Sequence, residues 1–289
     1  MKKLRDVSSV SSIISNIAGR PVKAVMIILS LTSVLFPIYW LVTSSVKMSQ
    51  EYIAYPPVMI PTKVVADSYV EIFTRDMLGR TFITSLTVAA AAMALCVLFG
   101  SMAAYTLSRG RINAKARAGI GLWFLIQKMY PAIATAIPLY LVMRALRLMD
   151  TKAALIIINT SFNLPLVIWL MIGFFDQLPY AMEESAMLDG CSYFKRFFLI
   201  ILPLTKPGLI AAGILTYVAT WNEFLFAIIL SIKNTRTLPV VIAGFITDRG
   251  LAWGPMAAAA TVMLVPVVAL AWLAQRDFVQ GLAMGAVKG

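Results

Sequence analysis

The sequence predicts an all-α membrane protein with six transmembrane helices and one structured loop at the edge of the membrane. Of its 289 residues, 60% are hydrophobic and only 13% are charged, which is not the composition of a soluble domain. Six apolar stretches are long enough to cross a bilayer core, which takes about 20 helical residues. Between two of them, Glu183 to Pro203 is the only long charged insertion with ordered helix signals.

The chain divides into a tail, a membrane domain and a second tail. Residues 1–20 are polar and basic, and the apolar run after them is too long for a signal peptide and lacks a small-residue cleavage site. We therefore expect an N-terminal tail over 1–20, a six-helix domain over 21–275 and a C-terminal tail over 276–289. The expected spans are 22–46, 81–107, 119–142, 153–175, 208–230 and 255–274.

The loop at 108–118, RGRINAKARAG, sets the expected orientation. It is short and carries only basic charges, and short basic loops are typical of the cytoplasmic side. Six spans put both termini on one side of the membrane. We therefore expect a multi-pass protein with both tails, this loop and the loop at 176–207 in the cytoplasm.

The loop at 176–207 has the pattern helix, glycine, helix. Pro179 suits a first helical turn, and Gly190 can end that helix in the left-handed conformation. Ser192 can cap a second short helix, which Pro203 ends. Such a pair can dock in a groove of a soluble partner. It can equally well fold on its own helix bundle, and the residues alone leave both readings open.

Two loops are expected on the opposite side, at 47–80 and 231–254. The first contains a proline-rich stretch and then a predicted short helix beginning at Asp67. The second contains LPVVIAGFI at 238–246, which is too short to cross a membrane and predicts an interfacial helix. Both loops can contact partners or simply cover the rim of the bundle.

Polar residues within the apolar spans are costly in hydrocarbon and need water or a partner. One interpretation is a water-filled solute pathway, because amides and carboxylates match sugar hydroxyls and aromatic rings match sugar C–H faces. The other is helix packing, including an ion pair between Lys128 and Glu223. Prolines in the third and fourth spans add expected kinks. The candidate pathway residues are Lys128, Tyr130, Asn159, Asn163, Trp221, Asn222 and Glu223.

Several classes of function are disfavoured by what the sequence does not contain. It has no histidine, which removes histidine-based catalysis and the commonest metal ligand. Cys96 and Cys191 lie far apart and predict neither a disulfide framework nor a metal site. No Gly-Lys dipeptide occurs, so a P-loop is absent. We expect a non-catalytic chain that binds no cofactor or metal. The basic residues are scattered, which disfavours nucleic acid as a partner.

The structured loop resembles the EAA motif of ABC importer permeases. The motif reads E-A-A, three residues, G, nine residues, I-x-L-P, and Ser185 replaces its second residue with another small one. In that family the loop is the coupling helix that sits in a cleft of the ATP-binding subunit. The resemblance thus implies a set of ATPase-coupling residues, namely Glu184, Ala186, Asp189, Gly190, Phe197, Ile200, Leu202 and Pro203.

More widely, the chain resembles carbohydrate importer permeases and is similar to the second permease of the maltose transporter. This resemblance rests on the segments 162–175, 221–230 and 281–289, which lie in the same order and spacing, and covers about 22–289. It implies a type I permease fold in a bacterial inner membrane and a heterodimer with a homologous permease. It further implies two ATP-binding cassette subunits that hold ATP and Mg, an extracytoplasmic solute-binding protein, and a sugar or polyol solute.

The expected function is therefore the permease subunit of an ATP-driven, binding-protein-dependent importer that works by alternating access. One alternative is an ion-coupled secondary transporter or channel, with Lys128 and Glu223 as the coupling charges. An intramembrane enzyme is a weaker third possibility, because no histidine and no suitably spaced acid pair is present.

Overall fold

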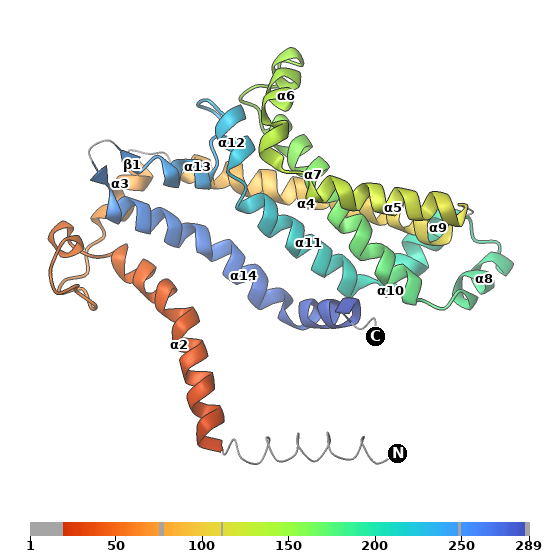
Figure 1. Cartoon of the computed structure of the whole chain (residues 1–289), viewed down its shortest axis with the longest axis horizontal. Coiled ribbons are helices and arrows are strands. Elements are labelled where there is room, and N and C mark those ends of the chain that lie inside the picture. The colour runs from red at the N-terminus through yellow and green to blue at the C-terminus, as the bar shows by residue number, and fades with distance from the viewer. Residues whose placement is uncertain (1–19, 75–77, 111, 248–249, 287–289) are drawn as a thin grey trace. The chain divides into compact units, whose positions relative to one another are not determined.

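The computed structural model describes residues 20–74, 78–110, 112–247 and 250–286. These residues are helical apart from connecting segments and one short β pair (Figure 1). They form two compact units. One contains the described part of 1–71 together with Ala252–Thr261, and the other contains 72–251 together with the described part of 262–289. The all-α fold class predicted from composition is confirmed.

Apart from Ala252–Thr261, the first unit is a long apolar helix followed by a structured loop. Helix α2 spans Arg20–Ser44, and the 3-10 turn η1 spans Ser49–Tyr52. The buried carboxylate of Glu51 orders the loop, because it accepts hydrogen bonds from the backbone N–H of Thr62 at 2.9 Å and from that of Met48 at 3.1 Å. Helix α3, Asp67–Thr74, begins at the predicted residue.

Three helices make the core of the second unit. These are α4 (Leu78–Arg109), α7 (Lys152–Gln177) and α11 (Lys206–Trp221), which pack against one another (Figure 1). Small residues permit the close approach: a Cβ atom at Gly100 would lie 2.7 Å from a methyl carbon of Val167. At Gly208 it would lie 2.6 Å from the ring of Phe174. Such contacts are typical of helices that pack inside a membrane.

Within the described residues, four helical segments are long and apolar enough to cross a membrane. They are Val22–Ser44, Leu78–Arg109, Lys152–Gln177 and Trp253–Gln275. Two bent helix pairs raise the number to six if each counts as one span. Four of the six expected stretches are thus continuous helices, and the other two are not.

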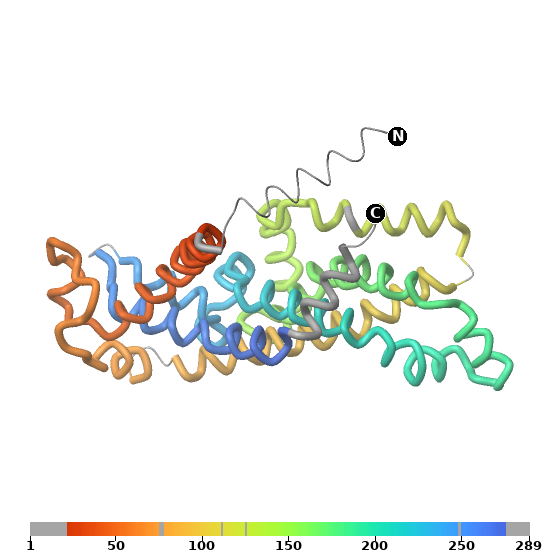
Figure 2. The backbone as a smooth tube through the Cα atoms, turned by 90° about the horizontal axis from the view of Figure 1, so that it is seen from below, coloured from red at the N-terminus to blue at the C-terminus, as the bar shows by residue number. Residues whose placement is uncertain are grey.

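The expected span at 119–142 is wrong as a single helix. Helix α5 (Ala114–Met129) and helix α6 (Ala132–Ala145) meet at an angle of 93°, and the chain turns between them in Figure 2. Pro131 has no N–H to continue the helix, and it pushes the preceding Tyr130 into the extended conformation, with ψ of 130°. The proline expected to interrupt this span therefore breaks it.

The expected span at 208–230 is also wrong, because α11 ends at Trp221. Glu223 then accepts hydrogen bonds from the amides at the start of a new short helix, α12 (Leu225–Leu230). At its other end α11 belongs to the second bent pair, Tyr193–Leu204 with Lys206–Trp221, which is bent by 82°.

The remaining elements follow α12. Helix α13 spans Leu238–Ala243, which confirms a short helix in the predicted segment. Strands β1 (Ile246–Thr247) and β2 (Gly250–Leu251) pair antiparallel, and α14 spans Trp253–Ala286. The expected C-terminal tail from 276 is therefore helical through Ala286. Residues 1–19 of the expected N-terminal tail and 287–289 lie outside the described residues.

Candidate functional site

The structured loop folds as two short helices joined at a glycine. Helix α8 spans Ala181–Leu188, and α9 (Tyr193–Arg196) continues through the π-helical turn η2 (Phe197–Ile201) into α10 (Leu202–Leu204). Gly190 adopts a φ of 75°, which an L side chain rarely tolerates. The predicted helix–glycine–helix arrangement is therefore present.

Local hydrogen bonds explain why the chain turns at Gly190. The N–H of Cys191 donates to the carbonyl of Ala186 at 2.9 Å, and the N–H of Gly190 donates to the carbonyl of Met187 at 3.0 Å. This pair of bonds is the Schellman motif that closes a helix C-terminus. Ser192 then accepts from the N–H of Lys195 at 3.4 Å and caps α9 as predicted.

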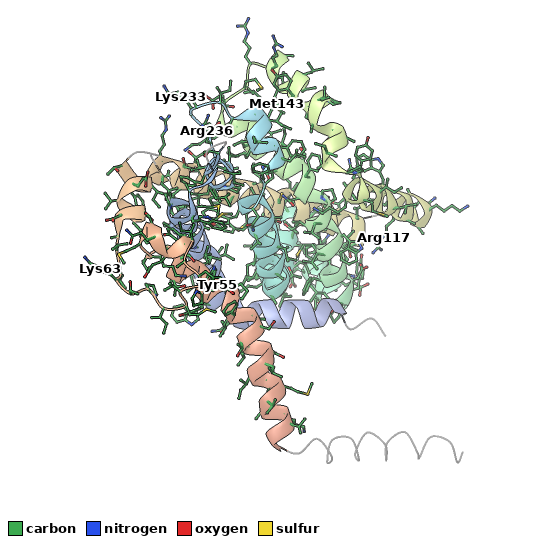
Figure 3. The ribbon with its side chains drawn as sticks, turned by 60° about the vertical axis from the view of Figure 1, so that its left-hand side comes forward. Tyr55, Lys63, Arg117, Met143, Lys233 and Arg236 are labelled. Atoms are coloured by element: carbon green, nitrogen blue, oxygen red, sulfur yellow. The ribbon has the colours of Figure 1, made fainter. Side chains whose placement is uncertain are left out.

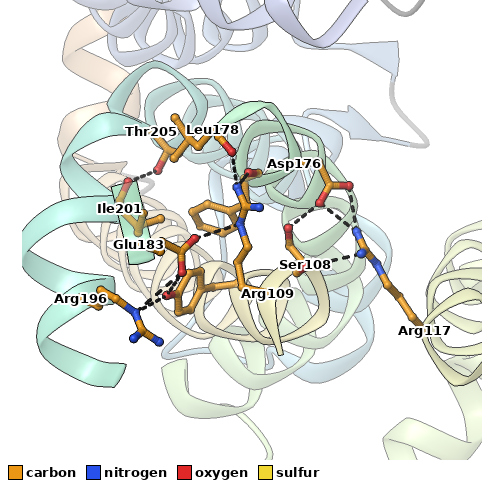
Figure 4. Close-up of polar contacts among 11 residues, drawn as sticks. Ser108, Arg109, Arg117, Asp176, Leu178, Glu183, Arg196, Ile201 and Thr205 are labelled. Atoms are coloured by element: carbon orange, nitrogen blue, oxygen red, sulfur yellow. Dashed lines mark hydrogen bonds and ion pairs between the residues drawn. The ribbon is translucent and has the colours of Figure 1, made fainter. Parts of the chain in front are cut away.

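A buried carboxylate ties α8 to the end of α4. Glu183 is 1% exposed, and its Oε1 lies 2.9 Å from Nε of Arg109. These two atoms lack the alignment of a hydrogen bond, so their attraction is mainly that of an ion pair. The Tyr105 hydroxyl donates to Oε2 of Glu183 at 2.7 Å, and Arg196 from α9 approaches the same oxygen at 3.8 Å (Figure 4). One carboxylate thus links both short helices to α4.

Arg109 also joins α4 to α7. Its Nη2 donates to the backbone carbonyls of Phe175, in the last turn of α7, and of Leu178, the residue that follows this helix. Beside it, Arg117 of α5 makes two contacts of 2.8 and 2.9 Å with the carboxylate oxygens of Asp176. The hydroxyl of Ser108 donates to the same carboxylate (Figure 4). The ends of α4, α5 and α7 therefore meet in one polar network.

Aromatic rings fill the space beneath this network. The ring of Tyr105 lies 5.6 Å from that of Phe175, 5.0 Å from that of Tyr193 and 5.1 Å from that of Phe197. Phe197 and Ile201 are 2% and 0% exposed. Such ring pairs contribute beyond their buried area, so they fix the second short helix against α4 and α7.

The outer face of the helix pair is open. Leu188 is 90% exposed, Leu199 71% and Phe194 61%, although large apolar side chains favour burial. Of the predicted coupling residues, Ala186 and Phe197 point inward and are buried, and Ile200 and Leu202 are partly buried. The others are exposed: Glu184, Asp189, Gly190 and Pro203. The set thus divides into an inner group and an outer group.

Glu183 and its partners were not among the residues expected to have a role. A signal for Glu183 was available, because helical periodicity puts it on the same face as the small residue Ala186, whereas Glu184 points elsewhere. No sequence pattern, however, identifies Arg109 or Tyr105 as the groups that meet it from α4.

Three of the predicted pathway residues lie in helix packing. Asn159 donates to the carbonyl of Leu155 at 2.9 Å, and Asn163 donates to the hydroxyl of Thr220 at 3.3 Å. Both asparagines are buried, and the bond of Asn163 joins α7 to α11. Trp221, 1% exposed, donates from its ring nitrogen to the carbonyl of Met263 at 3.1 Å.

The other four pathway residues fall in two groups, one at the end of α5 and one after α11. Tyr130 lines a cavity of about 270 Å³ where α5, α6 and α7 meet, and Lys128 donates to the carbonyl of Phe162 at 3.4 Å. Asn222 is exposed and bonds to its own helix. Glu223 accepts from the N–H of Phe226 at 2.6 Å, and among the described residues no ion pair joins it to Lys128.

Comparison with known proteins agrees with this architecture. The model of the family described as binding-protein-dependent transport system inner membrane component matches residues 96–276. The sulfoquinovosyl glycerol transport system permease protein SmoH of Agrobacterium fabrum is 33% identical over 273 residues, or 94% of this chain and 95% of that protein. The trehalose transport system permease protein SugB of Mycobacterium tuberculosis is 35% identical over 258 residues, or 88% of this chain and 93% of that protein.

A solved structure shares the fold. A chain from the crystal structure of a bacterial ABC transporter that imports the acidic polysaccharide alginate has a TM-score of 0.78 and 21% sequence identity, and the match covers 93% of this chain and 98% of that chain. The family model spans more than half of the sequence, and the relatives align along almost all of it. The chain therefore belongs to the inner-membrane permease components of binding-protein-dependent transport systems.

Proposed function

We propose that this chain is the translocating permease of an ATP-driven importer for a sugar or sugar-like solute. The observation that carries the proposal is the two-sided helix pair α8–α9. Its inner face is tied to α4 and α7 through Glu183 and Arg109, and its outer face exposes apolar and acidic side chains. An amphipathic pair with one face anchored and one face open is suited to receive a soluble partner.

The proposed mechanism is alternating access driven from the cytoplasm. ATP and Mg bind to two partner ATP-binding cassette subunits, and this chain binds neither. Closure of those subunits moves the docked pair α8–α9. The contacts of Glu183 with Arg109 and of Phe197 with Tyr105 pass the displacement to α4 and α7. The spans then reorient the solute cavity from one side of the membrane to the other.

The proposed coupling residues have different tasks in this scheme. The outer group contacts the partner: Glu184 and Asp189 by charge, and Gly190 by allowing close approach. The inner group, Ala186 and Phe197, holds the pair on the permease. Ile200, Leu202 and Pro203 connect the pair to the bend that precedes α11.

The relatives support the solute class. Proteins similar along most of the chain are named for sulfoquinovosyl glycerol, trehalose and diacetylchitobiose, all of which contain sugar units. Within this chain, the cavity beside Tyr130 and Gln127 offers an aromatic ring and an amide to a sugar. The buried Asn159, Asn163 and Trp221 act in helix packing in this scheme.

The proposed assembly contains a second homologous permease and an extracytoplasmic solute-binding protein, in addition to the two ATPase subunits. The chain lies in the bacterial inner membrane with both termini in the cytoplasm. The basic loop at 108–118 supports this orientation, because short basic loops favour the cytoplasmic side. Arg109 and Arg117 from this stretch belong to the polar network that holds α8, so the helix pair lies on the same side.

Reconstitution of the whole transporter in proteoliposomes tests this function. We expect uptake of the binding protein's sugar only with ATP, the ATPase subunits and the binding protein present. Liposomes that hold the two permeases alone under an ion gradient are the matched control. Uptake in that control would contradict the proposal and favour the ion-coupled alternative.

Glu223→Gln in the same system separates a pathway role from a structural one. Glutamine keeps one oxygen acceptor but turns an N–H₂ toward the amides of α12 that the carboxylate now caps. If the residue lines the pathway, uptake falls or ATPase activity without solute rises. A fall in uptake that only follows a lower midpoint of thermal unfolding would leave Glu223 with a capping role, and unchanged uptake and ATPase activity would contradict the pathway role.

A further inference from the structure

A second cavity, away from the helix pair, is lined by three basic side chains and by no acidic one among the described residues. It measures about 420 Å³ and lies between the first turns of α4 and the segment that runs from 233 through α13. This volume falls within the range of small-molecule sites, about 300–1,000 Å³. Its basic lining residues are Arg80 from α4 and Lys233 and Arg236 from the segment between α12 and α13, where Figure 3 labels the last two.

The positive charges of this cavity lack acidic partners among the described residues. No described acidic side chain lines the cavity, and no described ion pair includes Arg80, Lys233 or Arg236. The hydrogen bonds that two of them make go to neutral acceptors. Arg80 donates to the side-chain oxygen of Asn234 at 3.2 Å, and Arg236 donates to the carbonyl of Ile232 at 2.9 Å. Their charges remain available to an anion.

A carboxylate outside the cavity fixes the segment that carries these residues. Asp150 accepts the backbone N–H groups of Ile232, Lys233, Asn234 and Thr235 at 3.0 to 3.2 Å. Burial would raise the pKa of this carboxyl, but the amide hydrogen bonds outweigh burial and hold it well below its usual range. The segment is therefore pre-organised, which lowers the entropy cost of binding.

The remaining lining residues indicate what kind of anion fits. Thr81 and Thr84 are buried on α4 and bring hydroxyl groups to the wall, while Val240, Val241 and Phe245 make an apolar side. An inorganic ion would leave that apolar side unused. We infer that the cavity binds a small organic anion, with its carboxylate, sulfonate or phosphate group facing the three basic residues and its ring or chain facing Phe245.

Equilibrium dialysis of the full-length chain in phosphatidylcholine nanodiscs tests this inference, with radiolabelled D-glucuronate as probe and D-glucose as its neutral counterpart. We expect saturable binding of glucuronate that weakens as salt is raised, and no saturable binding of glucose. The measurement needs neither ATP nor transport, so its outcome is independent of the proposed function. Absence of saturable glucuronate binding would overturn the inference.

Charge-neutral variants locate the site. We expect Lys233→Gln combined with Arg236→Gln to weaken glucuronate binding by at least about tenfold, because two charge-assisted contacts are lost. Arg144→Gln is the matched control, since Arg144 is an exposed basic residue of α6 outside the cavity, and it should leave the affinity unchanged. Equal affinity of the double variant and the unmodified chain would contradict the assignment.

Two further arms identify the source of the anion. Displacement of glucuronate when phosphatidylglycerol is added to the nanodiscs would support the site and assign it to a lipid headgroup, whereas unchanged binding would support a soluble solute. A different result would overturn the inference: the unmodified chain does not bind glucuronate, and the double variant loses association with the solute-binding protein. The three basic residues would then form a protein contact.

Discussion

Glu183→Gln is expected to abolish most uptake and to destabilise the permease. The substitution removes the charge that neutralises Arg109, and their side chains are only 2% and 11% exposed. Leaving one member of a buried ion pair without its partner costs about 3–5 kcal/mol. Because the same contact ties α8 to α4, we also expect most of the sugar uptake per amount of permease to be lost. Uptake per amount of permease in the membrane and the midpoint of thermal unfolding in detergent are the measurements.

Glu184→Gln is the matched control for stability. It makes the same chemical change one residue further along α8, but Glu184 is exposed and should leave the unfolding midpoint unchanged. Its uptake should still fall if Glu184 contacts the ATPase subunit. An equal unfolding midpoint in both variants would mean that Glu183 is not an anchor. Normal uptake in the Glu183 variant would remove this contact from the mechanism.

Gly190→Asp is expected to abolish uptake while membrane insertion stays intact. No heavy atom lies within 4 Å of the position that a Cβ atom would take, so the folded chain has room for the side chain. The φ of 75° makes a non-glycine residue cost about 1–2 kcal/mol locally, which is small against the stability of a helix bundle. The new carboxylate lies beside Asp189 on the outer face and blocks close approach of a partner.

Gly190→Asn separates the effect of the added negative charge from the effect of the added side-chain volume. Asparagine tolerates the left-handed conformation and has nearly the size of aspartate. We expect the asparagine variant to retain part of the sugar uptake. The aspartate variant should show almost none when the same amount of permease is present in the membrane. Pull-down of the ATPase subunits by each variant reports docking directly. Full uptake in Gly190→Asp would show that close approach at this turn is not required.

Features set by neighbouring residues could be predicted from the sequence. The turn at Gly190 and the cap at Ser192 depend on backbone conformation and hydrogen bonds within a few residues, so their signals are local. Pro131 was expected to interrupt the third span for the same reason. The size of the interruption, a bend of 93°, depends on packing of α6 and carries no sequence signal.

Features set by distant residues could not be predicted. Glu183 looks like any acidic residue of an exposed helix until Arg109, which lies far along the chain, is placed 2.9 Å away. The end of α11 at Trp221 was missed because an apolar run predicts a continuous span, whereas Glu223 stabilises a new helix start. Hydropathy measures the transfer of side chains into lipid and does not include the hydrogen bonds of a capping side chain.

Arg109 limits how this protein can move. Its guanidinium touches Glu183 of α8 and the last carbonyls of α7, while its backbone belongs to α4. Arg109 therefore joins these three helix ends to one another. Thr205 is buried at the 82° bend before α11, and its hydroxyl donates to the carbonyl of Leu202 at 3.0 Å. We therefore expect a displacement of the helix pair to carry the adjoining ends of α4 and α7 with it.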